Sequence, residues 1–235
     1  SPNIILDNDL SASNAHWQIG SIASIGDTTS NNSLTLTNGA TATAEQILRI
    51  GNRTTAAGNS LIIGGTNSTL TAQQAVFVGA QGKNNELSIY DGGQATIAKD
   101  LYLGHNATAT GNEVNVQSNG VLNVSGKIYV GDNGSGNTFS INHGTANVDN
   151  DFILGARSLN NRYIQTGGTN TVSGTFINGR TEDATGKTTI GETDTTGNLG
   201  SVGEGATLDI QQNLTVGKEG GGSILLIHDG GTVNV

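Results

Sequence analysis

The sequence predicts an all-β solenoid, a parallel β-helix of about 8 to 9 short coils stacked through parallel strands. Three observations predict this fold class. A near-repeat of about 25 residues runs along the chain, each unit holds three short runs of alternating apolar residues, and glycine or asparagine separates the runs. With 34% hydrophobic and 4% aromatic residues among 235, the chain is leaner in apolar side chains than an ordinary globular domain.

The unit from Asn85 to Gly104, NELSIYDGGQATIAKDLYLG, shows the pattern most clearly. Its three apolar runs are Leu87 and Ile89, Ala95 and Ile97, and Leu101 and Leu103. Alternation at a period of two predicts strands with one buried face. Glycine between the runs supplies the bends, because it adopts the positive φ that tight bends often need. Each unit is therefore expected to form one coil of three strands.

A glycine follows an apolar residue at the end of each unit. These closing glycines are Gly26, Gly51, Gly79, Gly104, Gly131, Gly155, Gly179 and Gly217, at intervals of 25, 28, 25, 27, 24, 24 and 38 residues. The spacing predicts four regions. Residues 1–23 form an N-terminal cap or first irregular coil, 24–179 the regular coils, 180–204 an insertion or irregular coil, and 205–235 the final coils, ending within the solenoid.

Equivalent residues of successive coils are expected to stack. The rows of Ile89, Val116 and Ile141 and of Ile97, Val124 and Val148 should form buried columns. An asparagine precedes the first strand of each unit, at Asn59, Asn85, Asn112, Asn137 and Asn161. Two interpretations of these asparagines stay open: an internal ladder of hydrogen-bonded amides, or simple tolerance of turn geometry.

The segments NxLxI, GGxAxI and LxVG resemble the repeats in passenger regions of Gram-negative autotransporters. The resemblance covers Ser24 to Gly179 and Gly205 to Val235. It implies a right-handed parallel β-helix that is secreted or displayed on the bacterial outer-membrane surface. Such a chain would act as an adhesin, bind a host-cell surface protein, matrix or glycan, or associate with a neighbouring bacterial passenger. A passive stalk that presents another domain is the plainer alternative.

Several function classes are disfavoured by composition. The net charge of −9 and the scattering of ten basic residues argue against a nucleic-acid partner. There is no Cys, the four His residues fall in different units, and no apolar run is long enough for a membrane span. We therefore expect no metal site and no cofactor.

The enzymatic alternative is a carbohydrate-active β-helix, which needs carboxylates and basic groups converging on one groove. The candidate residues are Asp100, Lys127, Asp149, Asp151 and Arg157. Because Asp149 and Asp151 share the corner VDNDF, where short polar residues are common, a solvated turn is the simpler interpretation. The sequence thus favours a protein that is not an enzyme.

Binding hot spots favour aromatic and arginine side chains. The candidates are Trp17, Tyr102, Tyr129, Arg157, Arg162, Tyr163 and Arg180. Tyr102 and Tyr129 hold equivalent outward positions, so they should lie one above the other, either as ordinary cross-strand stacking or as part of a binding stripe. Trp17 is most simply a residue of the cap, and Arg180 begins the insertion.

Overall fold

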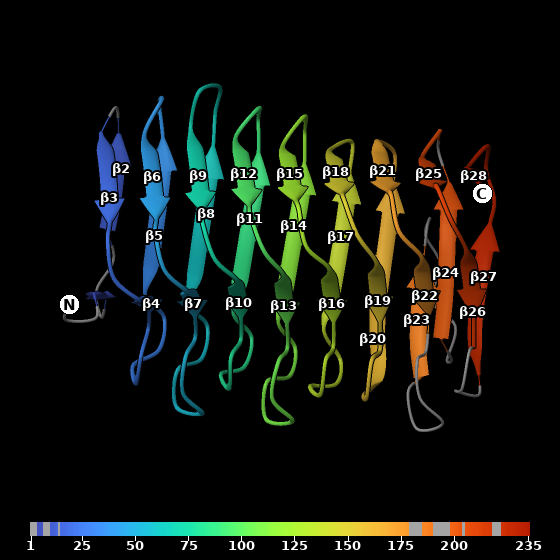
Figure 1. Ribbon diagram of the computed structural model, residues 1–235, viewed down its shortest axis with the longest axis horizontal. Coiled ribbons are helices and arrows are strands. Elements are labelled where there is room, and N and C mark those ends of the chain that lie inside the picture. The colour runs from blue at the N-terminus through green and yellow to red at the C-terminus, as the bar shows by residue number, and fades with distance from the viewer. Residues whose placement is uncertain are drawn as a thin grey trace.

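The computed structural model is an all-β solenoid of about 8 turns, in which strands of successive coils follow one another along a rod (Figure 1). It describes residues 4–6, 10–13, 15–178, 185–189, 198–203, 205–217 and 222–235. The described residues form no helix. The predicted fold class, a parallel β-helix, is therefore confirmed.

The described strands form three parallel sheets, and each regular coil contributes one strand to sheet B, then one to sheet C, then one to sheet A. Sheet A contains β1 (Ile4–Leu6), β4 (Ala23–Ile25), β7 (Leu48–Ile50), β10 (Val76–Val78), β13 (Leu101–Leu103), β16 (Ile128–Val130), β19 (Phe152–Leu154), β22 (Phe176–Asn178) and β26 (Leu214–Val216). Sheet B contains β2 (Leu10–Ser13), β5 (Ser33–Thr37), β8 (Ser60–Gly64), β11 (Glu86–Tyr90), β14 (Glu113–Gln117), β17 (Thr138–Asn142), β20 (Leu159–Thr166), β23 (Thr185–Thr189), β24 (Asn198–Gly203) and β27 (Ser223–Ile227). Sheet C contains β3 (His16–Ile19), β6 (Thr41–Ala44), β9 (Thr69–Ala72), β12 (Gln94–Ile97), β15 (Val121–Val124), β18 (Thr145–Val148), β21 (Thr169–Val172), β25 (Thr207–Ile210) and β28 (Thr232–Asn234).

The buried columns have the predicted register. Ile89 pairs with Val116, which pairs with Ile141, and Ile97, Val124 and Val148 pair in the same way. All six side chains are buried in the single core cluster that fills the tube. Because every coil adds the same few inward residues, a narrow tube is filled by a sequence with few apolar side chains.

The recurrent asparagines form a buried ladder, so the ladder interpretation is confirmed. The Oδ1 atom of each asparagine accepts hydrogen bonds from the backbone N–H and from the Nδ2 of the asparagine one coil earlier, as between Asn59 and Asn85 at 2.9 and 3.0 Å. The ladder runs through Asn32, Asn59, Asn85, Asn112, Asn137 and Asn161. Buried amides are stable there because their partners are amides of the next coil.

At the corner between sheets B and C, glycine is needed partly because a side chain would not fit. In the unit from residue 85, the positive φ values fall on Asp91 and Gly92 and not on Gly93. A Cβ atom at Gly93 would instead lie 2.4 Å from the carbonyl oxygen of Ile63 in the preceding coil. Glycine is required at Gly93 because two backbones approach closely, which is a different reason from the one expected.

The regular stacking changes after Asn178. In sheet B, β20 pairs with β23 through residues 159–163 and with β24 through residues 164–166, so the next rung is split between two strands. The predicted insertion at 180–204 thus contributes strands 185–189 and 198–203 to sheet B. Residues 179–184, 190–197 and 204 lie outside the described part of the chain.

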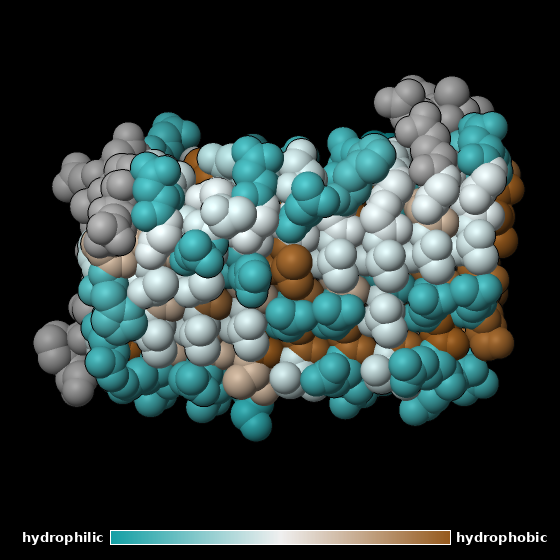
Figure 2. Space-filling view, turned by 90° about the horizontal axis from the view of Figure 1, so that it is seen from above, coloured by the Kyte–Doolittle hydropathy of each residue, from teal (hydrophilic) through white to brown (hydrophobic). Residues whose placement is uncertain are grey.

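Large apolar side chains lie near both ends of the described rod, and those near the C-terminus are exposed. Trp17, on β3, is half-buried and packs against the core, and its backbone pairs with Ala42 of the next coil. At the other end Ile224, Leu226 and Ile227 are 46%, 36% and 49% exposed. Figure 2 shows hydrophilic and neutral residues over most of one face, with hydrophobic residues gathered at the end that holds the C-terminus.

Candidate binding surface on sheet A

The outer face of sheet A carries a row of large side chains. Each strand there has three residues, and because the first and third point into the tube, the middle one points outward. We call the outward row Phe77, Tyr102, Tyr129, Ile153 and Ile177 the sheet A stripe; its members pair directly from strand to strand. The outer faces of sheets B and C mainly carry Thr, Ser, Asn and Gln at the corresponding positions.

The aromatic part of the stripe is a continuous stack. The ring centroids of Phe77 and Tyr102 are 4.8 Å apart with planes at 8°, and those of Tyr102 and Tyr129 are 4.9 Å apart at 4°. The predicted position of Tyr102 over Tyr129 is therefore confirmed. Arg49, the preceding residue of the row, places its guanidinium 6.0 Å from the centroid of Phe77. His105 meets Phe77 and Tyr102 edge-on at 5.1 and 5.0 Å.

The aliphatic part of the stripe is a second hydrophobic cluster outside the tube. Ile153 and Ile177 are only 1% and 8% exposed although they point away from the core. They form a cluster with Ala156, and Tyr129 packs against it. The stripe therefore passes without a polar break from aromatic rings to buried aliphatic side chains.

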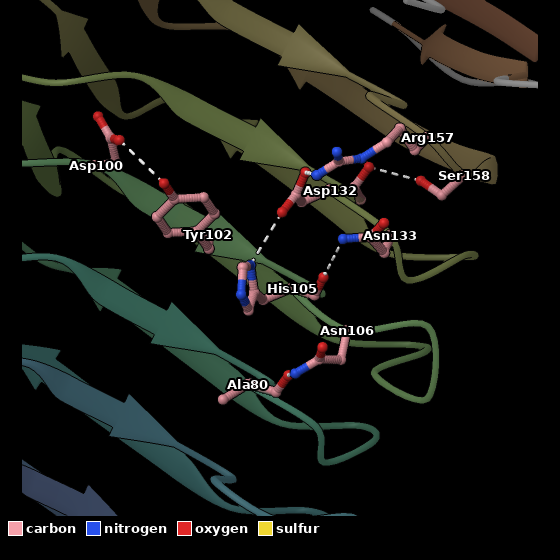
Figure 3. A network of polar contacts seen from close by, with 10 residues as sticks. Ala80, Asp100, Tyr102, His105, Asn106, Asp132, Asn133, Arg157 and Ser158 are labelled. Carbon is pink, nitrogen blue, oxygen red and sulfur yellow. Dashed lines mark hydrogen bonds and ion pairs between the residues drawn. The ribbon is translucent and has the colours of Figure 1, made fainter. Parts of the chain in front are cut away.

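A cluster of charged side chains borders the stripe on the side of the loops that lead to sheet B (Figure 3). The Nδ1 of His105 lies 3.0 Å from one carboxylate oxygen of Asp132, and the Nη2 of Arg157 donates to the other at 2.9 Å. The His105 contact is too poorly aligned for a good hydrogen bond and is a close polar contact. We call His105, Asp132 and Arg157 the loop-side cluster.

Asp132 holds the loop-side cluster together. Its side chain is only 7% exposed, whereas those of His105 and Arg157 are 37% and 61% exposed. Burial alone would raise the pKa of the Asp132 carboxyl, but His105 and Arg157 together outweigh burial, and the pKa is lowered. Asp132 is thus held as a carboxylate that positions the His105 ring and the Arg157 guanidinium.

The opposite border of the stripe, at the corner with sheet C, is also charged. The Tyr102 hydroxyl donates to Asp100 at 3.1 Å, and the Lys127 ammonium donates to Asp151 at 2.7 Å. Burial, followed by the negative charge of Asp100, raises the pKa of the Tyr102 phenol. Asp151 also accepts from the backbone N–H of Thr175 at 3.0 Å. Asp100 and Asp151 therefore fix neighbouring coils to one another as well as facing solvent.

A groove of about 410 Å³ lies at the aliphatic end of the stripe. It is lined by Asp151, Ile153, Thr175, Ile177, Asn213, Leu214 and Thr215. Its lining combines the aliphatic side chains of Ile153, Ile177 and Leu214 with a carboxylate, an amide and hydroxyls. The groove can thus receive a side chain with an apolar stem and a polar end.

The structure brings together three of the predicted binding residues: Tyr102, Tyr129 and Arg157. Arg162 is exposed on sheet B, where it pairs with Thr138 and lies outside the stripe. Trp17 lies on sheet C at the N-terminal end. Arg180 falls outside the described residues.

The prediction of Tyr163 as an exposed hot spot is wrong. Its backbone pairs with that of the inward-facing Phe139, and its side chain is completely buried. The Tyr163 hydroxyl donates to Gln165 at 2.8 Å, and burial raises the pKa of this phenol. A core position makes Tyr163 a packing residue that no partner can reach.

The sequence interpretation missed Phe77, Ile153, Ile177, His105 and Asp132. A signal for three of them exists in VFVG, FILG and FING, where the middle residue of each run is large and apolar. His105 and Asp132 both directly follow a closing glycine, which places them one above the other in successive coils. Reading the middle positions as one row would have revealed the stripe.

The residues considered for catalysis are spread over the two borders. Asp100, Lys127 and Asp151 lie along the sheet C corner, Arg157 belongs to the loop-side cluster, and Asp149 is exposed at the end of β18. Within the described part of the chain, no group of three or more His, Cys, Asp or Glu is placed to hold a metal ion.

The fold and this surface define a β-solenoid with an aromatic and aliphatic stripe on one sheet. Comparisons with protein-family models, curated proteins and solved structures find no match to the chain. Among the described residues there is no helix of the length and apolarity needed to cross a membrane.

Proposed function

We propose that the chain is a binding rod of the autotransporter passenger type, secreted or displayed on the bacterial surface, and that its outer sheet A face contacts a protein of a host cell or its matrix. The observation that carries this proposal is the continuous sheet A stripe between two charged borders. Protein interfaces have this arrangement, with aromatic anchors at the centre and polar groups at the rim. The partly exposed Phe77, Tyr102 and Tyr129 would supply these anchors, and the buried Ile153 and Ile177 would support them from the side.

The stack favours a protein partner over a glycan. A sugar ring packs on the free face of an aromatic ring, but the faces in the stripe are turned toward their neighbours. Phe77 stacks on Tyr102, and Tyr102 stacks on Tyr129. The outer ends of the stack meet Arg49 and the Ile153 cluster. Ring edges and hydroxyl groups remain for contact, which suits side chains of a partner protein.

The charged side chains on the two borders of the sheet A stripe would orient a bound partner. The Arg157 guanidinium and the His105 ring lie on one side, and Asp100, Lys127 and Asp151 lie on the other. Opposite charges on the partner would pair with these groups at the rim of the contact, where such pairs set specificity and association rate more than affinity. The stripe itself would supply most of the affinity.

The assignment to autotransporter passengers is supported by the repeat segments and by the parallel β-helix they form. On this proposal the rod works outside the bacterial cell, needs no cofactor and catalyses no reaction. Self-association with a neighbouring passenger would use the same face, because the other faces carry mainly small polar side chains.

A carbohydrate-active enzyme is the second candidate, and the groove beside Asp151 is the observation that favours it. That carboxylate is already paired with Lys127 and bonded to the backbone of Thr175. A general acid or base would have to leave both partners to act on a substrate. We therefore rank binding ahead of catalysis.

The proposal is tested by binding the purified chain to immobilised fibronectin, collagen, laminin and self, and to a glycan array, while the same preparation is incubated with soluble polysaccharides. We expect saturable binding to a protein surface and no change in polysaccharide chain length. Polysaccharide cleavage that is lost in Asp151→Asn would favour the enzyme. Absence of both binding and cleavage would favour the stalk.

A further inference from the structure

One coil of the rod has a polar interior. Gln165 on sheet B, Asn170 on sheet C and Asn178 on sheet A all occupy inward positions of the coil formed by β20, β21 and β22, and all three are buried. The paired residues of the preceding coil are Ile141, Ala146 and Leu154, and those that follow are Val202, Leu208 and Val216. The polar residues thus interrupt three apolar columns at the same level.

Part of this polar interior is internally satisfied. Asn170 donates from Nδ2 to the Tyr163 hydroxyl, which donates to the Oε1 of Gln165, each at 2.8 Å. Gln165 donates from Nε2 to the carbonyl oxygens of Gly168 and Thr207, both at 3.0 Å. A network of this kind is stable in a dry core only when each of its members finds partners.

Three atoms of the same coil have no partner in the protein. They are the Oδ1 of Asn170 and both the Oδ1 and Nδ2 of Asn178, all buried. An unpaired buried amide group costs about 1 to 3 kcal/mol, and native proteins commonly satisfy such groups with internal water. The unpaired atoms are two acceptors and one donor.

The next rung of sheet B is split beside this coil. Thr188 of β23 pairs with Tyr163, whereas Ser201 of β24 pairs with the adjacent Ile164. One continuous strand covers the equivalent residues of the regular coils. The rung of sheet B that follows the polar interior is therefore formed by two strands and not by one.

We propose that the interior of the coil Leu159–Asn178 is a binding site for water, held by Asn170 and Asn178. Water fits because it can donate to an Oδ1 atom or accept from Nδ2, and because it is neutral. Tyr163, Gln165, Asn170 and Asn178 offer no full charge to balance a bound ion. Asparagine is also smaller than the Leu154 that precedes Asn178 in its column, which leaves room for the molecule.

The test counts long-lived internal water by oxygen-17 magnetic relaxation dispersion in the wild-type chain, in Asn170→Leu/Asn178→Leu and in Thr171→Val. Thr171 points outward from the same strand β21, so its substitution is the matched control. We expect the double variant to lose long-lived water and the control to retain it. An equal count in the wild type and a folded double variant would overturn the proposal.

Should the double variant fail to fold, Asn178→Val replaces it, since valine already occupies this column at Val130 and Val216. A crystal structure of the wild type is a second, independent test of the water site. Ordered water within hydrogen-bonding distance of Asn170 Oδ1 or of the Asn178 amide supports the site, and protein atoms filling that space overturn it.

Discussion

A Cβ atom at Gly51 would lie 2.2 Å from the Nδ2 of Asn85, a rung of the amide ladder. The same relationship joins Gly26 to Asn59, Gly79 to Asn112, Gly104 to Asn137 and Gly131 to Asn161. Each closing glycine within the described residues also has a positive φ, +74° at Gly51. The closing glycines and the ladder asparagines are the two most regular features of the sequence. They are structurally coupled, because the glycine of one coil leaves the space that an asparagine of a later coil fills.

Replacing Gly79 by alanine is expected to destabilise the fold by about 2 to 4 kcal/mol, since it adds both a strained φ and a clash with the Asn112 side chain. Gly136→Ala is the matched control, because Gly136 has a similar φ of +71° but nothing within 4 Å of its Cβ position. The control should cost only about 1 kcal/mol. Urea unfolding followed by circular dichroism compares them, and equal midpoints would contradict the pairing of glycine and ladder.

Asn112→Ala should destabilise the rod by about 2 to 4 kcal/mol because it leaves the backbone N–H and the Nδ2 of Asn85 without an acceptor. Asn115→Ala, on the outer face three residues later, removes a half-buried amide and should cost no more than about 1 kcal/mol. Thermal unfolding of both variants measures the difference. Equal stability of the two variants would show that the amide ladder does not stabilise the fold.

Val116→Asp should cost about 4 kcal/mol or more, because an unpaired carboxylate would enter the dry column between Ile89 and Ile141. Asn123→Asp places the same carboxylate on the outer face of the same coil, where the Nδ2 of Asn147 can still donate to it, and should be tolerated. Retention of wild-type thermal stability by Val116→Asp would show that the register is wrong.

The loop-side cluster predicts an acid-sensitive contribution to stability. Because His105 and Arg157 lower the pKa of Asp132 in the folded state below its unfolded value, the contribution is present above the unfolded pKa and is lost as the pH falls through the folded one. The wild type should lose more stability than Asp132→Asn between about pH 5 and pH 3. Thermal unfolding across this range checks the slope, and parallel curves for the two proteins would remove Asp132 as the cause.

Much of the rod could be predicted from sequence because stacking repeats the same side chain at the same place. Ile89 over Val116 and Tyr102 over Tyr129 follow from the period alone. The period also places Tyr163 in the core, because it follows the ladder residue Asn161 by two positions, as Phe139 follows Asn137. The preference for aromatic hot spots was wrongly given more weight than this spacing. The outward positions of Ile153 and Ile177 were harder to recognise, because each directly follows another large apolar residue and the run shows no clear alternation.

The loop-side cluster was harder still to foresee. His105 and Asp132 directly follow closing glycines, but Arg157 follows Gly155 by two residues, so no single position in the repeat relates all three. Their meeting depends on the path of the loops after each closing glycine. Sequence periodicity describes the strands well and says little about side chains that leave the repeat.

The most direct test of the proposed function compares binding by Tyr102→Ser/Tyr129→Ser with binding by Thr96→Ser/Asn123→Ser, which alters the same two coils on the outer face of sheet C. The probe is the matrix protein or second copy of the chain captured by the wild type, and circular dichroism confirms that both variants are folded. If the sheet A stripe is the binding surface, the tyrosine variant should bind at least about tenfold more weakly and the sheet C variant should bind like the wild type. Unchanged binding by the folded tyrosine variant would contradict the account and direct the search to the insertion at 180–204.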